Sequence, residues 1–141
     1  MIRQDDAPLG SPGSPGGRIL IVDDDPVARR VLLSILERAH FDVMASTDGR
    51  EAWAELAAAR IDLVITDREM PAMNGVELLR AVRQSPRHGG VPVIMLTGTT
   101  LETAGEEADA EGASAFLTKP VSSRELLETV ERLLRPTDGR R

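Results

Sequence analysis

The stretch from Ile19 to Arg30, ILIVDDDPVARR, decides the fold. Four successive apolar residues without alternation are typical of a strand that is buried on both faces, as in a parallel sheet. Three aspartates, Asp23 to Asp25, end this strand, and Pro26 suits the first turn of a helix because its fixed φ angle is already helical. The stretch therefore predicts a strand, a short acidic turn and a helix in direct succession.

The same alternation of short apolar runs and helical patterns continues along the chain. We expect further strands around residues 41–45, 63–66, 93–96 and 115–117, and helices over about 52–59, 76–82, 101–111 and 122–134. This alternation predicts an α/β fold of five βα units, (βα)5, around a parallel sheet. Right-handed crossovers with a reversal after the second strand give a doubly wound sheet with strand order 2-1-3-4-5.

The first and last helices have apolar residues at helical spacing, which predicts the faces that they bury. On the first helix we expect the core-facing residues to be Val27, Val31, Ile35 and Leu36. The last helix opens with Ser122 and Glu125 at the spacing of a capping box. Its expected core-facing residues are Leu126, Val130, Leu133 and Leu134.

The ends of the chain differ in composition from its middle. Residues 1–17 include the Gly/Pro/Ser-rich stretch APLGSPGSPGG, and residues 136–141 read PTDGRR. Both segments offer too few apolar side chains to offset the entropy of ordering them. We expect a flexible leader over 1–17, one folded domain over 18–135 and a flexible tail over 136–141, and therefore a single-domain protein.

Composition excludes several classes of function. The chain has 141 residues, no cysteine, and 17 basic against 23 acidic side chains, for a net charge of -6. Without cysteine there is no disulfide framework, thiolate zinc site or cysteine nucleophile. The negative charge argues against nucleic-acid binding, which depends on clustered Lys and Arg. No apolar run approaches the roughly 20 residues of a membrane span or forms a signal peptide, so we expect a cytoplasmic protein with no membrane partner.

Chemically capable side chains stand at the ends of four expected strands. Asp23 and Asp24 follow the first strand, Asp67 follows the third, Thr97 the fourth and Lys119 the fifth, whereas the second strand offers nothing comparable. The carboxyl ends of parallel strands meet at one edge of the sheet, which is where such folds bind ligands. We therefore expect these five side chains to converge.

Three converging carboxylates repel one another unless a cation joins them. Oxygen ligands without cysteine or a nearby histidine favour a hard divalent cation, and Mg²⁺ typically combines a few carboxylates with water and phosphate oxygens. Lys119 and Thr97 on the opposite rim suit a phosphoryl group. The sequence thus predicts a magnesium-dependent site for phosphoryl transfer.

Four segments carry a resemblance to a known family. ILIVDDDPVARR, DLVITDREMPAMNG, PVIMLTG and AFLTKP resemble the signature segments of the response-regulator receiver domain, the CheY-like phosphoacceptor of two-component signal transduction. The match runs from about residue 18 to residue 135 in the family's order, and four segments together are far more specific than any one of them. The resemblance implies the flavodoxin-like fold, because receiver domains have the strand order 2-1-3-4-5 of that fold.

The resemblance also implies roles for the acidic residues. Asp67 would be the phosphoacceptor, attacking a phosphohistidine of a sensor histidine kinase or a histidine phosphotransfer protein in a phosphorelay. Asp23, Asp24 and Asp67, together with the backbone carbonyl of Glu69, would hold Mg²⁺. Asp25 is more simply a helix cap.

Three further roles follow from the resemblance. Thr97 would be the switch hydroxyl that moves toward the phosphoryl group, and Phe116 would be the aromatic switch that turns inward behind it. Lys119 would bridge to a phosphoryl oxygen, and its bond to Pro120 would be cis. Glu69 and Thr99 stand where the family adjusts attack by water on the phosphorylated state.

These roles imply a signalling protein. It would not be an enzyme, since the only reactions it would catalyse are its own phosphorylation and dephosphorylation. The signal would leave through protein contacts on the surface formed by the fourth helix, the fifth strand and the fifth helix. Two alternatives stay open. Asp23, Asp25 and Val27 fit the D-x-D-x-V motif of haloacid-dehalogenase-type phosphatases, which would make Asp23 the nucleophile, although the chain is short for that family and lacks its late acidic pair. A receiver-like module could also bind partners without phosphorylation.

Overall fold

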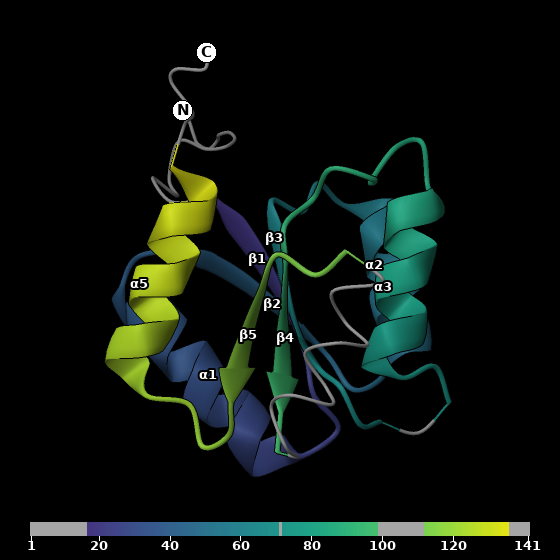
Figure 1. The fold of residues 1–141 in the computed structure, drawn as a ribbon. Coiled ribbons are helices and arrows are strands. Elements are labelled where there is room, and N and C mark those ends of the chain that lie inside the picture. Colours follow the sequence, from purple (N-terminus) through teal and green to yellow (C-terminus); the bar gives the residue numbers. More distant parts are fainter. Residues whose placement is uncertain (1–16, 71, 99–111, 136–141) are drawn as a thin grey trace.

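The computed structural model describes residues 17–70, 72–98 and 112–135, and these form a five-stranded parallel sheet covered by helices (Figure 1). The elements are, in chain order, β1 (Arg18–Val22), α1 (Pro26–Arg38), β2 (Asp42–Ser46), α2 (Gly49–Ala58), β3 (Leu63–Asp67), α3 (Gly75–Gln84), β4 (Val93–Thr97), β5 (Ala115–Thr118) and α5 (Ser123–Leu134). The strand order is β2-β1-β3-β4-β5. The predicted flavodoxin-like, doubly wound fold is confirmed. The helix expected over 101–111 lies outside the described residues, as do Thr99 and nearly all of the expected leader and tail.

Helices cover both faces of the sheet, with α1 and α5 on one face and α2 and α3 on the other (Figure 1). Each strand therefore buries side chains in both directions. Ile19 and Ile21 of β1 pack with α1 and α5, whereas Leu20 and Val22 pack with α2 and α3. This two-sided burial explains why the strands read as continuous apolar runs.

The face that α1 buries differs from the prediction. Val27 and Val31 are 69% and 50% exposed, while Leu32 and Leu36 are buried and Ile35 is partly buried. Apolar residues surround so much of this helix that the sequence offers two possible faces. Residue 32 lies about 100° further round a helix than residue 31, and packing against β1 and α5 selects the face of Leu32.

The helix starts are set by side-chain caps, as polar residues before the apolar runs predict. The Asp25 carboxylate accepts a hydrogen bond from the Val27 backbone N–H at 3.1 Å and so caps α1, as expected. Ser122 caps α5 by accepting from the Glu125 N–H at 3.1 Å. Of the residues expected inside α5, Leu126 and Val130 are buried, and Leu133 and Leu134 are partly buried against the same cluster.

Among the described residues, no helix is both long enough and apolar enough to cross a membrane.

Candidate functional site

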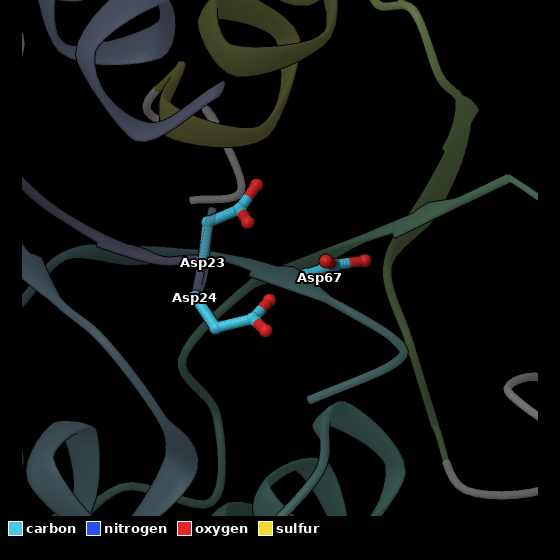
Figure 2. Close-up of side chains that lie close together, drawn as sticks. All are labelled: Asp23, Asp24 and Asp67. Atoms are coloured by element: carbon cyan, nitrogen blue, oxygen red, sulfur yellow. The ribbon is translucent and has the colours of Figure 1, made fainter. Parts of the chain in front are cut away.

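The reversal of strand order brings the ends of β1 and β3 together. Val22 pairs with Thr66 in the parallel register, so the aspartates that follow, Asp23 and Asp67, leave the sheet side by side. Figure 2 shows the side chains of Asp23, Asp24 and Asp67 lying close together at this edge of the sheet. One oxygen from each of Asp23, Asp24 and Asp67 lies within 4.8 Å of the others. We call these three residues the carboxylate cluster.

The three carboxylates differ in burial and in how they are held. Asp23 is fully buried and Asp67 is 6% exposed, whereas Asp24 is exposed. The backbone N–H of Asp25 donates to Asp23 Oδ1 at 2.9 Å. The main chain of Asp23 is also fixed, since its N–H donates to the Ser46 carbonyl at 3.1 Å. The cluster thus combines two oriented carboxylates with one that faces solvent.

Lys119 places a positive charge against two members of the cluster. Its Nζ lies 3.2 Å from Asp67 Oδ2 and 3.4 Å from Asp23 Oδ2. The backbone N–H of Lys119 donates to the Thr97 carbonyl at 2.8 Å, which fixes the chain just after β5. The Lys119–Pro120 peptide bond is cis, as the resemblance implies.

Burial and charge act in opposite directions on these groups. Burial raises the pKa of Asp67, and the nearby Asp23 adds to this, although Lys119 opposes both. Burial alone would lower the pKa of Lys119, but attraction to Asp67 and Asp23 outweighs it and the pKa is raised. One ammonium therefore leaves the cluster with excess negative charge in a partly desolvated place. An arrangement of hard oxygen donors with uncompensated charge fits a divalent cation such as Mg²⁺.

Thr97 ends β4, between the neighbouring strands that carry Asp67 and Lys119. Asp67 pairs with Leu96, so Thr97 stands one residue further along the same edge of the sheet, and it is 1% exposed. Phe116 lies in β5 and is partly buried against the α2/α3 side of the core. The structure thus places Thr97 beside the cluster and Phe116 two strands away from β3, on the side of the sheet that α2 and α3 cover.

Glu69 follows β3 in the loop that leads to α3. Its side chain is 65% exposed and forms an ion pair with Arg68. Its backbone N–H donates to the Asp67 carboxylate, which favours the ionised form of Asp67. The main chain of Glu69 is therefore at the cluster, while its carboxylate is engaged with a neighbour.

Two contributors were missed from the sequence. Arg29 Nη1 donates to the Asp23 carbonyl at 2.8 Å, which ties α1 to the end of β1. An arginine in the first turns of a helix opposes the helix dipole, and that unfavourable placement was the available signal. The second strand, from which nothing was expected, contributes the Ser46 carbonyl that accepts from Asp23. A backbone contact of this kind leaves no mark in the sequence.

Comparison with known proteins agrees with this geometry. The family model for the response regulator receiver domain matches residues 19–131. The chemotaxis protein CheY of Pseudomonas aeruginosa is 34% identical over 123 residues, which cover 86% of this chain and 99% of CheY. Another curated relative is much longer, and the match covers only 16% of it.

Solved structures agree as well. Chemotaxis response regulator CheY4 of Vibrio cholerae has a TM-score of 0.78 at 37% identity, covering 83% of this chain and 98% of that one. The receiver domain of a sensor histidine kinase from Pseudomonas aeruginosa, solved with a magnesium ion coordinated in its active-site cleft, has a TM-score of 0.77 at 28% identity and covers 83% of this chain and 96% of that one. With its strand order, its carboxylate cluster and these matches, the chain belongs to the response regulator receiver domain family of two-component systems.

Proposed function

We propose that Asp67 accepts a phosphoryl group from a phosphohistidine on a sensor histidine kinase or a histidine phosphotransfer protein. A carboxylate oxygen of Asp67 attacks phosphorus in line, the bond from phosphorus to the histidine nitrogen breaks, and the imidazole leaves with the bonding electron pair. The product is an acyl phosphate on Asp67. The observation that carries the proposal is the position of Asp67 at the end of β3. Its carboxylate lies within 4.8 Å of those of Asp23 and Asp24 and 3.2 Å from Lys119 Nζ.

Asp23, Asp24 and Asp67, with the backbone carbonyl of Glu69, would hold Mg²⁺. When bound, the ion neutralises charge on the acceptor carboxylate and on a phosphoryl oxygen. The excess negative charge of the cluster supports this assignment, as does the magnesium ion in the related receiver domain of a histidine kinase. Asp23 serves by orientation, because it is fully buried and held by the Asp25 N–H.

Lys119 would stabilise the charge that gathers on the phosphoryl oxygens. Its Nζ already faces the Asp67 carboxylate, so it needs no large rearrangement to meet a group attached there. The Thr97 hydroxyl would then donate a hydrogen bond to a phosphoryl oxygen, and the Phe116 side chain would turn inward from its partly buried position. This movement would alter the surface formed by β5, α5 and the segment between β4 and β5. A downstream protein would bind this surface and so respond to phosphorylation.

The haloacid-dehalogenase-type alternative requires Asp23 as the nucleophile. Asp23 is fully buried, and its two carboxylate oxygens accept from the Asp25 N–H and from Lys119 Nζ. A nucleophile must reach its substrate, and Asp67 is the more accessible of the two. Among the described residues, the groups needed for phosphorylation stand together, which also disfavours a module that only binds partners.

Acetyl phosphate, a small phosphoryl donor, tests the proposal without a cognate kinase. Intact mass spectrometry should show one added phosphoryl group on the wild-type protein in the presence of Mg²⁺ and none after chelation with EDTA. Asp67→Asn should remain unlabelled under the same conditions. Asp48→Asn, which removes the same charge from a helix cap outside the cluster, should be labelled like the wild type. Labelling of Asp67→Asn at the wild-type rate would overturn the proposal.

A further inference from the structure

The loop between β3 and α3 touches the start of α2 through backbone atoms. The described part of this loop, residues 68–70 and 72–74, carries Glu69 and is called the acceptor loop here. The Gly49 N–H of α2 donates to the Met73 carbonyl at 3.0 Å. A Cβ atom on Gly49 would lie 2.4 Å from that carbonyl oxygen and 2.8 Å from Met73 Cβ and Cγ. No residue but glycine fits this contact without moving the loop.

The acceptor loop is held in a conformation that it would not adopt by itself. Ala72 has φ +61°, in the left-handed region that costs a residue with a Cβ about 1 kcal/mol or more. Such a conformation persists only where its surroundings fix it. At its far end the loop is closed by the Gly75 N–H, which donates to the Arg68 carbonyl at 3.1 Å. The hydrogen bond from the Gly49 N–H to the Met73 carbonyl is a second contact that holds the loop.

The start of α2 is itself rigid enough to hold the loop in this way. Asp48 caps the helix by accepting from the Glu51 N–H at 2.9 Å. The Glu51 carboxylate reaches back and accepts from the Thr47 N–H at 2.6 Å and from the Thr47 hydroxyl at 3.0 Å. Gly49 therefore sits within a tightly hydrogen-bonded turn.

We propose that Gly49 is a positioning residue for the cation site, acting through Met73 to fix the acceptor loop and with it the main chain of Glu69. The proposal rests on the proposed function, since it assumes that the Glu69 carbonyl is a ligand of Mg²⁺. Gly49 touches neither the cluster nor the phosphoryl group. It sets the place of one ligand while Asp23, Asp24, Asp67 and Lys119 keep theirs.

The expected effect follows from the size of the clash. To restore ordinary contact, a Gly49→Ala variant must widen a 2.4 Å approach to at least 3.4 Å, a displacement of about 1 Å. Loss of the partners that orient a metal ligand weakens metal affinity by about 10-fold or more. Gly49→Ala should therefore raise the Kd for Mg²⁺ about 10-fold, while the acceptor groups remain in place.

Isothermal titration with Mg²⁺ tests this on the wild type, Gly49→Ala and the control Gly90→Ala, whose added Cβ meets no atom within 4 Å. We expect a weaker Kd for Gly49→Ala only. Its rate of labelling by acetyl phosphate should be low at limiting Mg²⁺ and return to the wild-type rate at saturation. An unchanged Kd in Gly49→Ala, or an equal loss in Gly90→Ala, overturns the proposal.

Hydrogen exchange of the acceptor loop in the absence of metal gives an independent readout. Gly49→Ala should speed exchange in residues 68–74, and Gly90→Ala should not. If Gly49→Ala fails to fold, Asp48→Ala decides instead, because loss of the cap loosens the start of α2 without a clash. Faster exchange in the acceptor loop and weaker Mg²⁺ binding would support the proposal. An unchanged exchange rate and an unchanged Kd would overturn it. A wild-type protein that binds no Mg²⁺ would refute the proposed function, and loop exchange alone would then decide whether Gly49 braces the loop.

Discussion

Replacing Asp67 with asparagine is expected to stabilise the metal-free protein at neutral pH, although the change removes an ion pair. Oxygens of Asp67 and the buried Asp23 lie within 4.8 Å, which corresponds to about 3.5 kcal/mol of repulsion at an effective dielectric constant of about 20. Asp24 lies at the same spacing but is exposed, and in water it adds about 1 kcal/mol of repulsion. Lys119 Nζ at 3.2 Å contributes about 5 kcal/mol of attraction on the same basis. The attraction exceeds the summed repulsion by less than about 1 kcal/mol, whereas desolvating an ion costs several kcal/mol. Ionised Asp67 should therefore destabilise the fold by about 1 kcal/mol.

The pH dependence has a definite sign. Burial raises the pKa of Asp67 above its ordinary value of 3.8, so the folded protein binds its proton more tightly than the unfolded chain does. The penalty of ionised Asp67 is fully present above the folded-state pKa and fades as the pH falls through that value toward 3.8. The stability difference between Asp67→Asn and the wild type should narrow over the same interval.

Urea denaturation in EDTA at low salt measures this difference, with Asp48→Asn as a control that changes net charge equally and keeps a helix-capping side chain. A gain of about 1 kcal/mol corresponds to about 3 °C in Tm for a domain of this size. Saturating Mg²⁺ should reverse the order, because the wild type binds the ion more tightly and gains more stability from it. Two results would refute the reasoning. One is a metal-free Asp67→Asn variant that is less stable than the wild type at pH 7, and the other is a difference in the free energy of unfolding that does not change with pH.

Three further predictions concern the ammonium group and the first helix. Lys119→Met should bind Mg²⁺ at least as tightly as the wild type, because the competing ammonium group is removed. Acetyl phosphate should nevertheless label this variant about 100-fold more slowly. Labelling at the wild-type rate would show that Lys119 takes no part in the reaction. Leu32→Ala should cost about 2–5 kcal/mol in the free energy of unfolding, against less than about 0.5 kcal/mol for the exposed Val31→Ala, and equal losses in urea denaturation would contradict the assigned face of α1. Asp25→Ala should lower stability by about 1 kcal/mol through the lost cap, while Asp25→Asn should not, as thermal denaturation can show.

Most of the fold could be predicted because the local signals agree with one another. Apolar strand runs, polar caps and turn residues all indicated the same alternation of elements, and the strand order followed from the handedness of crossovers. The first helix was the exception. Its apolar residues offered two faces, and only packing against β1 and α5, which the sequence does not display, selects Leu32 over Val31.

The candidate site divides in the same way. Side chains at strand ends could be placed together from topology alone, and the structure brings Asp23, Asp24, Asp67 and Lys119 to one point. Contacts that run through the main chain could not be predicted, because they depend on how separate elements meet. The hydrogen bond between the Gly49 N–H and the Met73 carbonyl is the clearest example, since the local sequence around either residue gives no sign of the contact.

Identification of the labelled residue tests the central claim most directly. The wild-type protein is treated with acetyl phosphate and Mg²⁺, digested, and its peptides are sequenced by mass spectrometry to locate the acyl phosphate. Phosphate on Asp67 alone, absent when Mg²⁺ is chelated, is the expected result. Phosphate on Asp23, or labelling that proceeds equally well without the ion, would contradict it.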